Sequence, residues 1–185
     1  MRVIFLNGPP RSGKDYAGGI LRDEFGGRIF KMAGELKERT HALYRQMNIK
    51  GEPLPHDYFE AAKDEPQECF LGLTPREAYI AVSERLFKPL YGQQVFGRLL
   101  AQQLEGDLAI ITDSGFAPEA EPIVEKFGAE NCLLARIHRA GYDFSSDSRS
   151  YIDLSHLGVP CLDIQNDGGS GFRASLLNVF RSSLA

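Results

Sequence analysis

The chain has 185 residues, 43% of them hydrophobic, and a formal net charge of −4 from 21 Lys and Arg against 25 Asp and Glu. This length supports one well-packed core, so we expect a single domain over residues 1–185. The negative charge argues against binding a polyanion over the whole surface, so any nucleic-acid contact must be local. The sequence has no long apolar run, no recognisable signal peptide and no paired cysteine spacing. It therefore favours a cytoplasmic protein with reduced thiols and no membrane partner.

Short apolar runs predict five buried strands, at residues 3–6, 28–32, 108–112, 131–137 and 159–164. Helical spacing of apolar residues predicts helices at residues 14–25, 36–47, 74–89, 94–104 and 172–180. A polar, proline-containing excursion at 48–73 carries a predicted helical turn at 58–63, and TPRE at 74–77 predicts a capping box. Strands that alternate with helices indicate an α/β sandwich built on a parallel sheet.

The sequence GPPRSGKD, from Gly8 to Asp15, follows the first predicted strand and matches the phosphate-binding pattern G-x-x-x-x-G-K-[ST] except at its last position. In such a loop the backbone N–H groups approach phosphates, and the helix starting near Lys14 presents its positive dipole end. We predict that Lys14 binds the terminal phosphates of a nucleoside triphosphate. The other predicted nucleotide-binding residues of this region are Gly8, Arg11, Ser12, Gly13, Asp15 and Tyr16.

Asp15 replaces the hydroxyl residue that normally touches the magnesium ion of the nucleotide. A carboxylate beside a bare triphosphate would be repelled, whereas Mg²⁺ between them makes the contact favourable, directly or through a metal-bound water. Asp113 ends the predicted strand 108–112, where parallel sheets place their ligands, so we predict that both aspartates hold the ion. The alternative for Asp113 is a turn or a helix N-cap, because Ser114-Gly115 follows.

A long polar segment separates the last two predicted strands, and we expect residues 138–157 to form a lid. Arg136 and Arg139 are candidate catalytic residues, and Arg149 is a candidate acceptor ligand. Arginines that close over a transferring phosphoryl group exclude water and neutralise developing charge. Alternatively, these arginines pair with aspartates on a solvated loop, where each pair contributes little to stability.

The phosphoryl acceptor is expected across the sheet edge from the loop, in an excursion over residues 34–105. A phosphate could sit at the start of the capped helix, where Arg76 lies. Surface charge is the alternative explanation for the basic residues of this region. The candidate acceptor-binding residues are Lys31, Glu35, Asp57, Arg76, Ser114 and Arg149.

Four features give the chain a family resemblance: the SGKD end of the loop, the TPRE helix start, Asp113 followed by SGF, and NDG at 166–168. Over nearly its whole length the chain resembles the deoxynucleoside monophosphate kinases of tailed phages, within the thymidylate kinase-like group. The SGKD ending is also similar to the corresponding loop of animal-type phosphomevalonate kinase. It therefore indicates a group of kinases but does not identify the phosphoryl acceptor. The sequence of the segment 147–151 and the short length of the chain also make it similar to compact phage kinases that phosphorylate 5-hydroxymethyluracil within DNA.

The resemblance implies a P-loop NTPase fold of the nucleoside monophosphate kinase type. This fold is a three-layer sandwich with a five-stranded parallel sheet of order 2-3-1-4-5 and a lid. By the same resemblance, Asn166 would lie near the adenine of ATP, and the protein would work in the cytoplasm of an infected host cell. The size of the chain departs from the broader phage nucleotide-kinase pattern.

Two kinase functions remain open, both with ATP and Mg²⁺ as cofactors. A monophosphate acceptor needs arginines and no general base, whereas a hydroxymethyl group must lose a proton, for which Glu35, Asp57, Asp64 and Asp113 are candidate bases. We favour DNA that contains a modified pyrimidine as the partner, with its base single-stranded or flipped from the duplex, over a free deoxynucleoside monophosphate. The alternative outside the enzymes is a non-catalytic module that only binds nucleotide. The oligomeric state is open between a monomer and a homodimer.

Overall fold

The computed structural model describes residues 1–47, 56–145, 147–169 and 171–184. The chain forms two compact units, one from Met1–Met32 with Gly97–Ala185 and one from Ala33–Phe96. The second unit overlaps the excursion predicted at 34–105, and the expectation that residues 1–185 act as one domain stays a prediction. None of the described helices is both long and apolar enough to cross a membrane.

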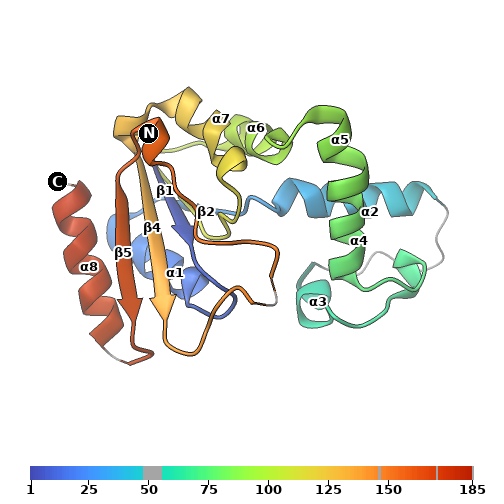
Figure 1. The fold of residues 1–185 in the computed structure, drawn as a ribbon, viewed down its shortest axis with the longest axis horizontal. Coiled ribbons are helices and arrows are strands. Elements are labelled where there is room, and N and C mark those ends of the chain that lie inside the picture. The colour runs from blue at the N-terminus through green and yellow to red at the C-terminus, as the bar shows by residue number, and fades with distance from the viewer. Residues whose placement is uncertain (48–55, 146, 170, 185) are drawn as a thin grey trace. The chain divides into compact units, whose positions relative to one another are not determined.

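The first unit is built on a five-stranded sheet whose strands all run parallel (Figure 1). Its order is β2-β3-β1-β4-β5, which confirms the predicted α/β class and the strand order 2-3-1-4-5. The carboxyl ends of all five strands therefore lie at one edge. The strands are β1 (Arg2–Asn7), β2 (Arg28–Phe30), β3 (Leu108–Ile111), β4 (Cys132–Arg139) and β5 (Cys161–Asn166).

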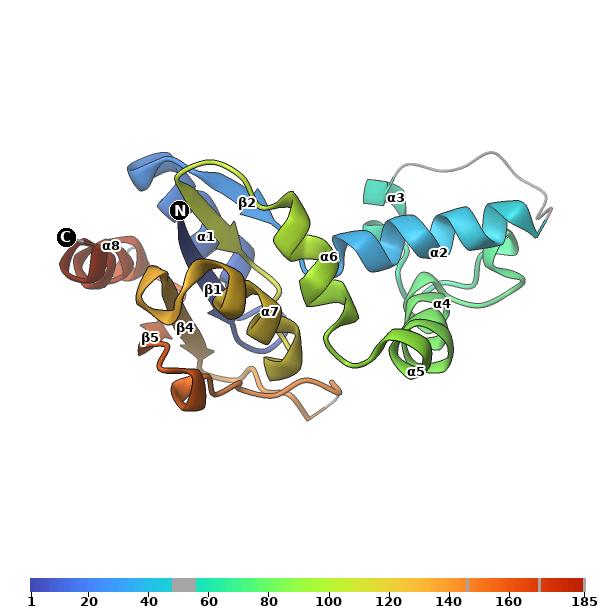
Figure 2. The ribbon, with the colours of Figure 1, turned by 90° about the horizontal axis from the view of Figure 1, so that it is seen from above.

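Helices cover both faces of this sheet, as Figure 2 shows. Successive residues of a strand point to opposite faces, so β1 contributes Val3 and Phe5 to one apolar core and Ile4 and Leu6 to the other. The first core also contains side chains of α6 (Val95–Gln103) and α7 (Ala117–Phe127), and the second those of α1 (Lys14–Phe25) and α8 (Gly171–Leu184). The sheet is thus the middle layer of a three-layer sandwich.

The second unit is helical, with a small aromatic core that contains Phe59 and Phe70. Its helices are α2 (Gly34–Gln46), α3 (His56–Ala61), α4 (Pro75–Val82) and α5 (Lys88–Tyr91). The predicted end near Pro89 is confirmed to within two residues, because a π-helical turn at Ser83–Phe87 connects α4 to α5 and the helical run ends at Tyr91. Pro89 lies in the first turn of α5, where its missing N–H is tolerated.

The predicted capping box at the start of α4 is confirmed. The Glu77 N–H donates to Thr74 Oγ1 over 3.1 Å, and the Thr74 N–H donates to the Glu77 carboxylate over 2.9 Å. Two backbone donors that the helix itself cannot satisfy are therefore paired with side chains.

Replacing Thr74 by alanine should lower the free energy of unfolding by about 1 kcal/mol, because the Glu77 N–H loses its acceptor. Thr74→Ser keeps the hydroxyl and should stay within about 0.5 kcal/mol of the parent. Urea denaturation followed by circular dichroism measures both. Equal stability of the alanine variant and the parent would show that the box contributes nothing.

Candidate active site

The loop between β1 and α1 passes so close to two strands that side chains are excluded. A Cβ on Gly8 would lie 2.6 Å from the backbone oxygen of Ile137 on β4. One on Gly13, whose φ is 101°, would lie 2.5 Å from the side-chain nitrogen of Asn166 on β5. Glycine at both positions is therefore a requirement of the loop's path.

Polar groups in and beside the loop are left for a ligand. Within the described residues, no side chain caps the first turn of α1, so its N–H groups can meet an anion. The hydroxyls of Ser12 and Ser114 are buried, with the residues 0% and 2% exposed, and the described part of the chain offers neither a partner. Because buried polar groups are nearly always hydrogen-bonded, these two atoms fit a ligand with oxygen atoms.

Lys14 places its ammonium inside the loop. It donates to the carbonyl oxygens of Gly8 and Pro9, each over 2.6 Å. Burial, and after it the nearby charge of Arg149, lowers the pKa of Lys14 from 10.5 to about 8. A bound phosphate would replace these two carbonyl contacts with contacts to an anion, which favours the charged form.

Asp15 joins the first turn of α1 to the ends of β2 and β3. Thr112 Oγ1 donates to its carboxylate over 2.8 Å, and the Lys31 ammonium forms an ion pair with the same oxygen. Partial burial works against ionisation, but the hydrogen bonds from Lys31 and Thr112 outweigh it and lower the pKa of Asp15. Asp15 is thus a carboxylate with a cation beside it, and the role of Lys31 in acceptor binding stays a prediction.

Asp113 follows Thr112 at the carboxyl end of β3. Its carboxylate accepts a hydrogen bond of 2.5 Å from the backbone N–H of Met32. Asp15, Thr112 and Asp113 bring hard oxygen donors to one edge of the sheet, and these are the atoms that Mg²⁺ prefers. Among the described residues no group of three or more acidic, His or Cys side chains forms a metal cage. The metal roles of both aspartates stay predictions.

Arg149 reaches from the segment 138–157, which is predicted to form a lid, toward the loop. Its Nε donates to Asp147 over 2.8 Å, and its Nη2 pairs with the other carboxylate oxygen. Its stem lies on Gly115, where a Cβ would come within 2.3 Å of Arg149 Cδ. The structure therefore brings Lys14, the segment after Asp113 and Arg149 together.

The two arginines of β4 have different surroundings, because side chains three positions apart on a strand point to opposite faces. Arg139 donates to the backbone oxygen of Arg11 over 3.0 Å and lies 4.7 Å from the ring centroid of Tyr142. Arg136 binds both oxygens of Asp163 on β5, over 3.0 and 2.6 Å, and this pairing raises its pKa. Arg139 thus contacts the loop, whereas Arg136 is paired with Asp163 on the neighbouring strand. The catalytic role of each arginine stays a prediction.

Asn166, the last residue of β5, is hydrogen-bonded to the loop. Its Nδ2 donates to the Ser12 carbonyl oxygen over 2.7 Å, and its Oδ1 accepts from the Gly168 N–H over 2.9 Å. This bracing role was missed by the sequence reasoning, and the predicted contact with adenine stays a prediction. Tyr16 is 63% exposed with its ring 6.3 Å from that of Phe172, and its contact with nucleotide also stays a prediction.

The remaining candidate acceptor ligands belong to the second unit. Glu35 pairs with Arg39 over 2.8 Å, and Arg76 pairs with Asp64 over 2.7 Å. The side chain of Asp57 lies outside the described residues. The acceptor roles of these three residues stay predictions.

The sequence reasoning also missed Asn7, the last residue of β1. Its side chain contacts the segment after Asp113 and the segment after Arg149. The available signal was a polar residue that ends an apolar strand directly before a phosphate-binding loop.

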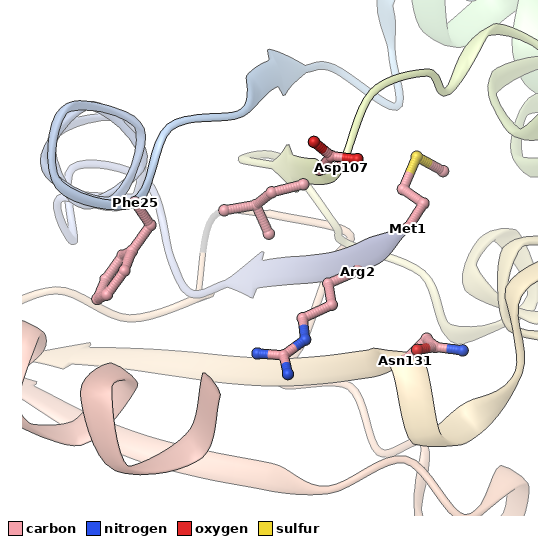
Figure 3. A pocket seen from close by; sticks show the side chains of 6 residues that line it. Met1, Arg2, Phe25, Asp107 and Asn131 are labelled. Carbon is pink, nitrogen blue, oxygen red and sulfur yellow. The ribbon is translucent and has the colours of Figure 1, made fainter. Parts of the chain in front are cut away.

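A cavity of about 440 Å³ lies at the amino end of the same sheet, as Figure 3 shows. Its lining residues begin or precede strands, whereas the loop follows the carboxyl end of β1. Open α/β sheets bind ligands at their carboxyl ends, so this cavity is separate from the candidate site. The lining residues are Met1, Arg2, Phe25, Asp107, Leu108 and Asn131.

No protein-family model and no curated protein matches the chain. Solved structures do match it. A protein from Thermus thermophilus has a TM-score of 0.52 and 13% identity, with 100% of this chain and 98% of that chain covered. A sugar kinase from a Janibacter species has a TM-score of 0.51 and 10% identity, with 100% of this chain and 94% of that chain covered. At such identities the likeness concerns the fold. The chain has the predicted α/β fold with a five-stranded parallel sheet of order 2-3-1-4-5, and it is similar in fold to these solved structures.

Nucleotide binding should weaken as the pH rises through about 8, because the ammonium of Lys14 loses its charge there in the free protein. Bound phosphate stabilises the ammonium, so the midpoint in the complex should lie higher. Calorimetric titration with ATP from about pH 6.5 to about 9.5, at fixed Mg²⁺ and ionic strength, measures the effect. Lys14→Gln should bind ATP more weakly and lose this dependence. The same pH dependence in that variant would assign it to another group.

Asp15→Asn should raise the Mg²⁺ concentration needed for half-maximal ATP binding about tenfold, because a charged oxygen donor is lost. Fluorescence titration with Mg²⁺ at fixed ATP measures this shift without requiring turnover. Asp23→Asn is the matched control, since Asp23 is an exposed aspartate of the same helix that pairs with Arg22. An unchanged magnesium requirement in the Asp15 variant would remove its metal role.

Proposed function

We propose that the protein is an ATP- and Mg²⁺-dependent phosphotransferase. The observation that carries this proposal is the placement of two cations from distant parts of the chain, Lys14 and Arg149, beside one phosphate-binding loop. Phosphoryl transfer is accelerated mainly by positioning and by positive groups around the transferring phosphoryl. A module that only binds nucleotide needs the loop but not a second cation beside Lys14, so the arrangement favours an enzyme.

The residues around the loop would bind the phosphoryl donor, ATP, and each has a proposed role. Backbone N–H groups of the loop and the first turn of α1 bind the phosphates, and Lys14 exchanges its two carbonyl contacts for phosphate oxygens. Asp15, Thr112 and Asp113 would hold Mg²⁺, which supplies charge neutralisation on the phosphates when bound. Arg149 neutralises charge on the transferring γ-phosphoryl group.

The favoured acceptor is the hydroxymethyl group of 5-hydroxymethyluracil in phage DNA. Such an alcohol must lose a proton, and Glu35, Asp57 and Asp64 are the candidate bases that do not also hold the ion. In the second unit, Arg76 pairs with Asp64 and Lys37 with Glu60, so two cations suited to a monophosphate are engaged with carboxylates. Such surface pairs contribute little and a ligand can replace them, so the preference for an alcohol acceptor rests on the resemblance carried by the segment 147–151.

A deoxynucleoside monophosphate that is converted to the diphosphate is the second candidate. One observation favours it: the Ser114 hydroxyl, for which the described residues offer no hydrogen-bond partner, lies next to Gly115, on which Arg149 packs. An anionic acceptor oxygen could satisfy that hydroxyl and bind the guanidinium at the same time.

The deciding experiment offers ATP and Mg²⁺ with two acceptors in parallel, an oligonucleotide containing 5-hydroxymethyldeoxyuridine and a mixture of the deoxynucleoside monophosphates. Mass spectrometry should find one added phosphoryl group on the oligonucleotide base. Arg149→Gln should lower that rate by at least about 10²-fold, because a charge-stabilising donor is lost. Diphosphate product with an untouched oligonucleotide would select the second candidate. Tight ATP binding with neither product would contradict the phosphotransferase and favour a non-catalytic module.

A further inference from the structure

The position of Arg149 depends on residues outside the lid segment. We propose that Asn7 and Gly115 are positioning residues for Arg149: Asn7 fixes the backbone beside it, and Gly115 leaves the space in which its stem lies. This inference rests on the proposed phosphotransferase function and names residues that set its efficiency.

Asn7 ties three parts of the site together through one side chain. The residue is 1% exposed and directly precedes Gly8 of the loop. Its Nδ2 donates to the carbonyl oxygens of Ser114, over 2.7 Å, and Ser150, over 3.1 Å. Its Oδ1 accepts from the Ile152 N–H over 3.2 Å. Both amide hydrogens and the amide oxygen are therefore used.

The partners of Asn7 are neighbours of the chemical groups. Ser114 follows Asp113, Ser150 follows Arg149, and Asn7 itself is bonded to Gly8. An aspartate at position 7 has the same shape but loses both donors and places a carboxylate against two carbonyl oxygens. Such a change loosens the backbone next to Arg149 without adding bulk.

Gly115 acts on the arginine stem rather than on the backbone. A Cβ there would lie 2.3 Å from Arg149 Cδ and 2.8 Å from its Cγ. The φ of Gly115 is not in the left-handed region, so alanine suits its backbone. Gly115→Ala should therefore displace the Arg149 side chain while the loop keeps its path.

The guanidinium end is fixed by Asp147, whose side chain is 8% exposed. That carboxylate accepts from the Nε, over 2.8 Å, and from the backbone N–H of Arg149, over 3.0 Å. With stem and head both held, the charge is oriented before substrates bind. A misplacement of about 1 Å at such a group can lower a rate about 10²-fold.

The test compares two variants with two matched controls. Gly115→Ala and Asn7→Asp should each lower kcat about 10²-fold and leave KM for ATP within about threefold. Gly19→Ala is the control for an added methyl group, because its Cβ on α1 would meet nothing within 4 Å. Asn131→Asp is the control for the lost amide. Asn131 directly precedes β4, away from Arg149, and its Nδ2 donates to the Phe127 carbonyl oxygen. Both controls should keep the parent kcat.

A second readout does not require turnover. Exchange of the Arg149 Nε–H with water, followed by nitrogen-15 NMR and assigned with Arg149→Lys, should accelerate about tenfold in both variants and in neither control. Faster exchange without phosphate transfer by the parent protein would overturn the proposed function and leave the positioning role intact. Parent-like exchange in Gly115→Ala would overturn the positioning role, whatever kcat does. If Asn7→Asp fails to fold, Gly115→Ala decides alone.

Discussion

The close passage of the phosphate-binding loop along β4 and β5 is the constraint on which the rest of the site depends. Gly8 leaves no space for a side chain against β4, and Asn166 on β5 donates to the Ser12 carbonyl. Arg139 adds a hydrogen bond to the Arg11 carbonyl. The sheet thus sets the path of the loop before a phosphate arrives. A loop ordered in advance loses less conformational entropy on binding, so more of the contact energy appears as affinity.

The charged groups of the site have partners inside the protein. Lys14 donates to carbonyl oxygens, Asp15 pairs with Lys31, and Arg149 pairs with Asp147. These contacts keep the charges in place, but a ligand has to replace some of them, so its net binding energy is a difference between new and old contacts. A ligand with several closely spaced negative charges, such as a magnesium-bound triphosphate, gains most from this exchange.

Local signals were enough to predict the strands, the loop and the capping box, because each depends on residues near one another in sequence, whereas the strand order was implied by the family resemblance. The helix α7 was not predicted, and its packing against the sheet outweighs the hydrogen bond that Pro122 removes. The contacts of Asn7 and the Asp15–Lys31 pair were missed for another reason. They are created by strand order, which brings together segments that sequence spacing alone does not relate.

The second unit enters the chain between β2 and β3 and has its own aromatic core around Phe59 and Phe70. All strand pairs of the sheet are made by residues of the first unit. The described residues at 33–96 make none of the sheet's strand pairs. Evolution can alter this insert, or recombination can replace it, while the unit that carries the sheet is inherited unchanged. Related chains could in this way diverge in the helical unit faster than in the sheet and the loop that follows β1.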